Sequence, residues 1–318
     1  MPSDMTDLGE LQTNPIDDAR RALEPVADIG IAPPGWRLPG ATRLGHVSLQ
    51  IADLSRSLPY YQQVLGLDAL ERTDGSVLLG TADGRTPLVQ LTEQKGARAV
   101  PQHGRLGLYH FAILLPDRAS LGRYVQYLAE IGVRAGASDH LVSEALYLRD
   151  PDGLGIEVYA DRPRRRWRAV DRQLQMATDP LDLEDVINAG GGEPWAGMPA
   201  GTTMGHMHLH VGNLDQATAF YHVALGLDKM VWSYPGALFL ASGGYHHHLG
   251  VNTWAGAQAP QPTSDDARLL EWRVILPSQT DVRGAVDSFS AGGYAAREDE
   301  GSWITTDPWN TAVRLVSG

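Results

Sequence analysis

Apolar and polar residues alternate along several short segments of the chain, the pattern of a β-strand with one buried face. Examples are HVSLQI (46–51), HFAILL (110–115) and GIEVYA (155–160). Two longer segments, LSRSLPYYQQVLG (54–66) and SLGRYVQYLAEIG (120–132), have helical spacing and end at glycine, the residue that most often closes a helix. Short strand-like pieces follow each helix. This part of the chain therefore predicts two successive β-α-β-β-β units.

The same pattern occurs twice in the chain. LGHVSLQIADLSRSLPYYQQVLGLDAL (44–70) matches MGHMHLHVGNLDQATAFYHVALGLDKM (204–230) without a gap, at a constant separation of 160 positions. Further on, RDPDGLGIEV (149–158) answers TDPWNTAVRL (306–315). A match of this length indicates two homologous modules.

The repeat predicts an α+β protein of two modules. Each module is expected to hold paired β-α-β-β-β motifs that form a curved mixed sheet around a cavity. We place the first module at 42–161 and the second at 203–318. Residues 1–41 form an N-terminal extension, and 162–202 a linker with one short helix at LDLEDVIN.

Composition narrows the possible functions. The net charge of −12 argues against a nucleic-acid-binding surface, and the basic cluster at 162–168 is short enough to be a solvated linker. The chain has no cysteine, which excludes disulfides and thiolate metal sites. No apolar run reaches membrane-spanning length, and the first residues do not form a signal peptide. We expect a cytoplasmic enzyme or binding protein without a membrane or nucleic-acid partner.

Three metal-binding side chains fall on the polar faces of the first module's strands. His46 and His110 open their strands, and Glu157 stands in the middle of GIEVYA, opposite apolar neighbours. A carboxylate inside a strand needs either water or a cation as its partner. Two histidines and one carboxylate on one side of a metal, with open positions on the other, suit non-haem Fe(II) or Mn(II). We therefore interpret His46, His110 and Glu157 as a metal triad.

The longer motifs resemble a known superfamily. LGHV, YYQQVLGL and RDPDGLGIEVY are similar to the vicinal oxygen chelate fold of glyoxalases, bleomycin-resistance proteins and type I extradiol dioxygenases. LYHFAILLP, GASDHLVSEALYLRDPDGLGIEVYADRP and GGYHHHLGVNTW resemble, more closely, the two-module catechol 2,3-dioxygenase type. The resemblance covers nearly everything from residue 42 onward.

The resemblance implies a reaction and its residues. It implies an extradiol dioxygenase that cleaves a catechol-type vicinal diol with O₂ at one Fe(II), with Mn(II) as the alternative, held by His46, His110 and Glu157. Tyr147 matches a tyrosine that contacts the bound substrate, and His140 matches a region that supplies an acid–base histidine. His248 and His103 are weaker alternatives for that role. We also expect a homo-oligomer.

The second module departs from the metal-binding pattern. His206 matches His46, but Glu271 and Arg314 stand where His110 and Glu157 would be. Because an arginine would repel a cation, we interpret this module as structural and expect Glu271 and Arg314 to form a partly buried ion pair.

Two other functions remain open. A glyoxalase I adds a fourth ligand, usually a carboxylate, on the last strand of the first half, where this chain has Gln90 in PLVQLTE. A metal-free drug-binding protein can also be built on this fold, with an aromatic-walled cup and no triad.

Overall fold

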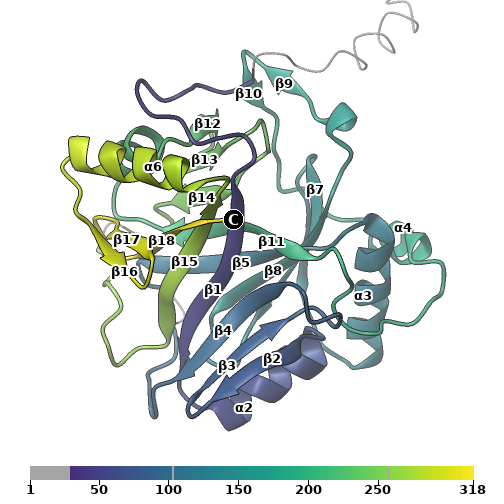
Figure 1. Cartoon of the computed structure of the whole chain (residues 1–318). Coiled ribbons are helices and arrows are strands. Elements are labelled where there is room, and N and C mark those ends of the chain that lie inside the picture. The colour runs from purple at the N-terminus through teal and green to yellow at the C-terminus, as the bar shows by residue number, and fades with distance from the viewer. Residues whose placement is uncertain (1–28, 102–103, 257) are drawn as a thin grey trace, which may run out of the picture.

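The computed structural model describes residues 29–101, 104–256 and 258–318 and contains two eight-stranded mixed sheets (Figure 1). The first sheet has the order β16-β17-β18-β15-β1-β4-β3-β2, with bounds β16 Ala296–Asp299, β17 Ser302–Thr306, β18 Ala312–Ser317, β15 Arg268–Leu276, β1 Arg43–Ile51, β4 Pro87–Glu93, β3 Ser76–Gly80 and β2 Asp68–Thr73. The second has the order β12-β13-β14-β11-β5-β8-β7-β6, with bounds β12 Asp228–Val231, β13 Ala237–Ala241, β14 Leu249–Asn252, β11 Thr203–His210, β5 Gly107–Leu114, β8 Gly155–Asp161, β7 Ser143–Arg149 and β6 Gly136–Asp139.

Each sheet is built from halves of both modules. β1 pairs antiparallel with β15, and β11 pairs antiparallel with β5. The first half of one predicted module therefore continues into the second half of the other. The α+β class and the two homologous modules are confirmed, but a sheet closed within a single module is not what the chain forms. This exchange decides which side chains meet.

The helices pack against the apolar faces of the sheets, and their buried side chains belong to the same core cluster as those of the central strands. The predicted helices appear as α2 (Leu54–Pro59), which runs into a π-helical turn η1 (Tyr60–Val64), and as α3 (Arg118–Glu130). The second module repeats this with α5 (Leu214–Ala217), π-helical η3 (Thr218–Ala224) and α6 (Gln279–Ala291). The π-helical turn η3 of the second module forms without a proline. The equivalent turn η1 therefore does not need Pro59 of α2.

The segment between the modules also has regular structure. It contains the 3-10 turn η2 (Arg164–Arg166), a hairpin of β9 (Ala169–Val170) and β10 (Gln173–Leu174), and α4 (Leu183–Ala189). In Figure 1, α4 lies beside α3. A Cβ on Gly122 of α3 would meet the Val186 carbonyl oxygen at 2.2 Å, so this glycine allows the close approach of the two helices.

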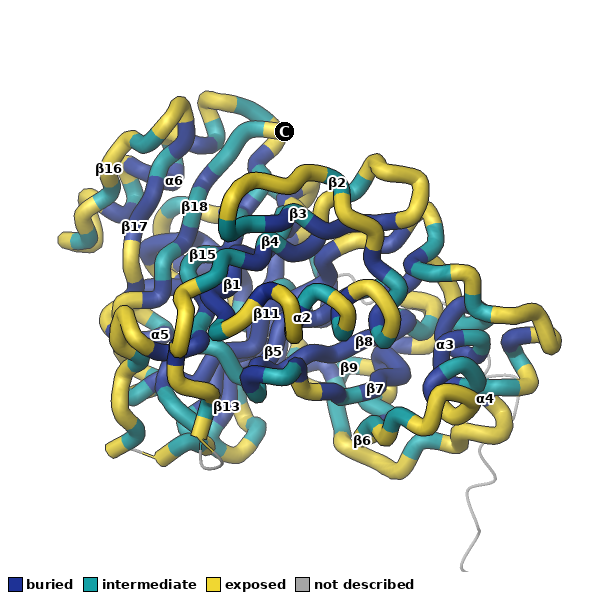
Figure 2. The backbone as a smooth tube through the Cα atoms, turned by 90° about the horizontal axis from the view of Figure 1, so that it is seen from below, coloured by how far each residue is buried: buried dark blue, intermediate teal, exposed yellow. Residues whose placement is uncertain are grey.

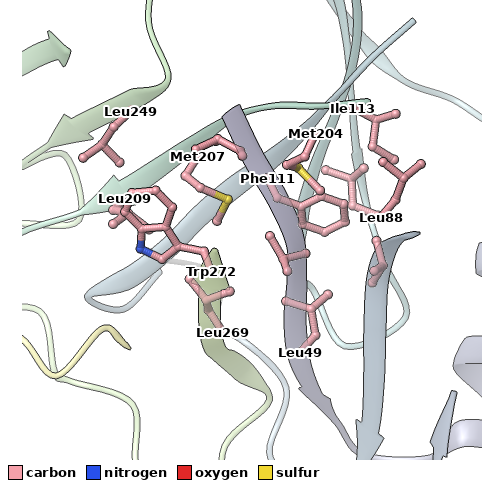
Figure 3. Packing of buried hydrophobic residues seen from close by; sticks show 14 of the residues in the cluster. Leu49, Leu88, Phe111, Ile113, Met204, Met207, Leu209, Leu249, Leu269 and Trp272 are labelled. Carbon is pink, nitrogen blue, oxygen red and sulfur yellow. The ribbon is translucent and has the colours of Figure 1, made fainter. Parts of the chain in front are cut away.

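The apolar faces of the central strands pack sheet against sheet. Figure 3 shows Leu49 of β1, Phe111 of β5, Met207 of β11 and Trp272 of β15 gathered in one cluster, and all four are buried. Figure 2 shows central strands such as β1 and β11 mostly buried, whereas exposed backbone lies along connecting loops and at the edge strand β2. The polar faces of the same central strands are thereby turned away from this core. None of the helices in the described part of the chain is long and apolar enough to cross a bilayer.

Candidate metal centre

Three neighbouring strands of the second sheet bring a carboxylate and two imidazoles together. The groups are His110 of β5, Glu157 of β8 and His206 of β11, whose ligand atoms all lie within 4.8 Å of one another. Glu157 Oε2 is 3.0 Å from His110 Nε2 and 3.2 Å from His206 Nε2. All three side chains are buried. The described residues thus contain a buried His/Glu/His metal-binding triad.

Two glycines allow the strands to approach closely enough to form this cluster. A Cβ on Gly205, which precedes His206, would lie 1.9 Å from the Tyr159 hydroxyl. A Cβ on Gly155, two residues before Glu157, would lie 2.0 Å from the Tyr109 carbonyl oxygen. A side chain at Gly155 would push β8 away from β5, and one at Gly205 would displace the Tyr159 side chain, which reaches across from β8.

The protonation states of the three groups suit a cation. Burial lowers the pKa of His110 and of His206 and so favours the neutral imidazole, the form that binds a metal ion. Burial alone would raise the pKa of Glu157, but the two histidines outweigh it and hold that pKa well below its usual range. His110 Nε2 is buried and, despite its short distance to Glu157, lacks hydrogen-bond geometry. An N,N,O donor set with such an orphaned nitrogen fits a divalent metal ion.

His46 does not belong to this cluster, which corrects the triad predicted from the sequence. It lies on β1 in the other sheet, where its surroundings include Glu271, Arg273 and Arg314. The polar-face prediction for His46 is right, but the partner strand of β1 is β15 rather than β5. His206, the equivalent residue of the second module, occupies the third ligand position instead. The second module is therefore not merely structural.

The predicted ion pair of the second module is confirmed. Arg314 Nη2 lies 2.8 Å from Glu271 Oε2, and Arg314 Nε donates to both carboxylate oxygens at 2.8 and 2.9 Å. Arg314 also contacts Asp299, and Glu271 also contacts Arg273. This cluster holds a guanidinium where the first cluster would hold a metal.

Tyr147 and His140 both lie at the candidate site. Tyr147 pairs directly opposite Glu157 across β7 and β8, as the hairpin spacing predicts. The Tyr147 hydroxyl is 2.6 Å from His140 Nε2, and His140 Nδ1 is 2.6 Å from the Ala177 carbonyl oxygen. Since the carbonyl can only accept, Nδ1 carries the proton and Tyr147 donates to Nε2. Burial near Glu157 raises the pKa of Tyr147 well above its usual range, so the phenol keeps its proton.

A cavity of about 390 Å³ opens in front of the triad. Its walls are aromatic, with Tyr109, Tyr234, Phe239 and Trp254 beside the triad and the Tyr147–His140 pair. The linker segment closes one side through residues 176–178, held there by paired backbone hydrogen bonds between Asp139 and Asp179. A cavity with aromatic walls and polar side chains in its lining suits an aromatic ring that carries oxygen substituents.

The sequence did not identify a further histidine of the cavity, His247. Its ring centre is 4.1 Å from that of His206. Asp161 Oδ1 accepts from His246 Nε2 at 2.9 Å, and His246 Nδ1 lies 2.7 Å from His247 Nδ1. If both histidines are neutral, this series of hydrogen bonds leaves His247 Nε2 without a proton, and its lone pair is available in the cavity. The concentration of histidines in HMHLH (206–210) and HHH (246–248), with no equivalent in the first module, was the available signal.

Of the two weaker alternatives, His248 can be placed and lies away from the triad. His248 Nδ1 accepts from the Ser242 backbone N–H at 3.2 Å, and His248 lines a different cavity. His103 lies outside the described residues.

Known proteins share the sequence and the fold of this chain. The model of the Glyoxalase/Bleomycin resistance protein/Dioxygenase superfamily matches residues 43–158. A catechol-2,3-dioxygenase of Bacillus subtilis (strain 168) is 44% identical over 271 residues, which cover 84% of this chain and 94% of that protein.

Solved structures share the fold at low identity. A presumed dioxygenase from Bacillus subtilis subsp. subtilis str. 168 superposes with a TM-score of 0.61 at 13% identity, covering 89% of this chain and 86% of that one. Glyoxalase I from Zea mays superposes with a TM-score of 0.52 at 18% identity, covering 87% and 92%. From its long, closely similar relative and its two-module fold, the chain belongs to the glyoxalase/bleomycin resistance protein/dioxygenase superfamily.

Proposed function

We propose that the chain is an extradiol dioxygenase of the catechol 2,3-dioxygenase type, which cleaves a catechol-type vicinal diol with O₂ at a mononuclear metal. The relative named catechol-2,3-dioxygenase spans most of both chains and supports this activity. The buried triad below an aromatic-walled cavity supports the assignment of the site.

One observation separates this function from that of a glyoxalase. Gln90 pairs with Ser48 across β1 and β4, in the sheet that lacks the triad. In the other sheet the equivalent pair is His208 with Gly250, across β11 and β14. The position at the triad that corresponds to the fourth glyoxalase ligand is therefore Gly250, which has no side-chain donor atom. A Cβ at Gly250 would lie 3.0 Å from the His208 ring, so a side chain at this position would have to displace that ring.

His110, Glu157 and His206 would hold the metal. Fe(II) is the expected ion, with Mn(II) the alternative, because both accept two imidazoles and one carboxylate. When bound, the metal supplies a centre where diol and O₂ meet and exchange electron density. Three protein donors leave open positions for a diol with two oxygens and for O₂.

The remaining polar groups would position the diol and move its proton. Tyr147 donates to His140, so the tyrosine oxygen has lone pairs free to accept from a diol hydroxyl. His247 Nε2 offers a base on the His206 side of the cavity. Aromatic walls exclude water and hold the ring flat. Metal, ring and proton acceptor would thus meet in one cavity.

An oxygen-uptake assay tests the proposal. The protein is loaded anaerobically with Fe(II) or with Mn(II), mixed with a panel of catechols, and followed by oxygen electrode and visible absorbance. We expect oxygen consumption with formation of a yellow ring-opened product. Turnover of a hemithioacetal without oxygen, best with Ni(II) or Zn(II), would establish the glyoxalase function instead. Binding without any turnover or metal dependence would establish the binding protein.

The proposal includes two properties of the whole protein. We infer a homo-oligomer, which light scattering after size-exclusion chromatography tests, and a cytoplasmic location, which cell fractionation tests.

A further inference from the structure

A second cavity, of about 760 Å³, shares no lining residue with the cavity at the triad. It lies where the beginnings of β1 and β11 face each other. Equivalent residues of the repeat line it from both modules, Leu44 with Met204 and Gly45 with Gly205. We call it the arginine cavity, after the four side chains described next.

The arginine cavity concentrates positive charge in an acidic protein. Arg43, Arg85, Arg164 and Arg273 line it, and no Asp or Glu is among its lining residues. The chain as a whole carries a net charge of −12. Arg43, Arg85 and Arg164 are exposed, so water and salt screen their mutual repulsion, but together they make the cavity attractive to an anion.

Two of these arginines form no close ion pair within the described part of the chain, although Arg85 is near enough to Asp83 to help lower the pKa of that carboxyl group. No ion pair joins Arg43 or Arg85 to an acidic side chain there. Arg164 stacks over the Tyr245 ring at 5.9 Å and donates to the Gly243 carbonyl oxygen at 3.2 Å. Only Arg273 meets a carboxylate, Glu271, at 3.1 Å, and Glu271 is shared with Arg314.

Buried polar atoms without partners lie at the same cavity. The side-chain oxygens of Thr42 and Ser242 have no hydrogen-bond partner among the described residues, although these residues are only 5% and 2% exposed. His46 Nε2 is also buried without a partner. Burial and then the charge of Arg273 lower the pKa of His46 to about 4, so its ring is neutral. Hydroxyls left unpaired in a protein cost free energy that a bound polar ligand would recover.

The rest of the lining is apolar. Leu114, Met204, Ile275 and Val316 form part of the wall, together with the Tyr245 ring. An inorganic ion would leave this surface uncovered. A ligand with an anionic end and a hydrocarbon body would meet both halves of the lining.

We propose that the arginine cavity binds a small organic anion, with its carboxylate or phosphate held by Arg43, Arg85 and Arg164 and its apolar body against Met204 and Ile275. Guanidinium groups bind both oxyanions through paired hydrogen bonds. The hydroxyls of Thr42 and Ser242 would complete the anion's hydrogen bonds. This site is separate from the triad and does not depend on its metal.

Calorimetric titration of the full-length, metal-free protein at low salt tests the proposal. Benzoate, phenyl phosphate and neutral benzyl alcohol are the probes, so the first two separate a carboxylate site from a phosphate site. We expect one of the two anions to bind at one site per chain. Arg43→Gln and Arg164→Gln should each weaken that binding at least five-fold. Arg283→Gln, which removes an exposed charge from α6, is the matched control and should leave it unchanged.

Three results would overturn the proposal. These results are that neither anion binds, that benzyl alcohol binds as well as the anions, or that Arg283→Gln weakens binding as much as the cavity variants do. An aromatic anion could also enter the cavity at the triad. Tyr147→Phe therefore serves as a second control. If anion binding becomes weaker in this variant and not in the arginine variants, the anion binds in the cavity at the triad and the proposal is wrong.

Discussion

His46 and His206 are equivalent in the repeat, but only His206 lies with His110 and Glu157. We therefore expect His206→Ala to lose nearly all bound metal, because two donors and an unfilled space remain. His46→Ala should keep the wild-type metal content, since its ring lies beside Glu271 and Arg314 in the other sheet. Elemental analysis of anaerobically loaded protein measures both. Equal loss in the two variants would contradict the assignment.

Tyr147 contacts the reaction space without being a metal ligand. Tyr147→Phe removes the hydroxyl that donates to His140 and leaves the ring in place. We expect the metal content to stay at the wild-type level and kcat to fall about 100-fold, the effect of losing one proton-transfer group. His140→Ala should lower kcat in the same way. Stopped-flow turnover beside elemental analysis separates the two quantities, and wild-type turnover in both variants would remove this pair from the chemistry.

At the scale of elements, the Glu271–Arg314 pair joins β15 to β18 in the sheet without the triad. Both side chains are only 13% exposed, so removing one charge leaves the other poorly solvated. In the single variants, Glu271 keeps its contact with Arg273, or Arg314 keeps its contact with Asp299, and this limits the loss of stability. We expect Glu271→Gln and Arg314→Met each to lower the free energy of unfolding by about 1–2 kcal/mol, and the double variant to lose less than their sum. Additive losses in urea unfolding would show that the pair is not coupled.

The turn between β7 and β8 contains a buried carboxyl group, Asp150, which accepts from Tyr61 at 3.1 Å. Burial raises the pKa of Asp150 from 3.8 to about 7. The folded protein therefore favours the protonated form, and this group's contribution to stability is complete below pH 4 and lost as the pH rises through about 7. Asp150→Asn should remove this decrease in the free energy of unfolding between low and high pH, which is on the order of a few kcal/mol. Urea unfolding at pH 5 and pH 8 measures it, and an equal pH dependence in wild type and variant would contradict it.

For the whole molecule, the hydrophobic pattern identified strands, helices and the polar faces correctly. His110, Glu157 and Tyr147 were placed from alternation and hairpin spacing, which depend only on nearby residues. The choice between His46 and His206 depended on which half-modules pair, and both pairings bury the same faces of β1 and β11. Local periodicity is identical in the two arrangements, so it cannot select one. Only the excess of histidines in the second module favoured the arrangement that forms.

The exchange of halves makes the two modules dependent on each other. A fragment of residues 1–161 contains His110 and Glu157 but lacks β11, the partner strand of β5, and with it His206. A fragment of residues 162–318 has β11 without β5 and β8. We expect neither fragment alone to hold stoichiometric metal, and the two expressed together to form a complex that does, because the missing edges then pair. Elemental analysis of the co-purified fragments measures this.

The control introduces His46→Ala into the first fragment. The reconstituted complex should keep its metal, because His46 lies in the sheet without the triad. If the first fragment alone bound one metal and lost it on His46→Ala, β1 would be pairing with β5 inside a single module. That outcome would reverse the strand exchange described above and restore His46 as the third ligand.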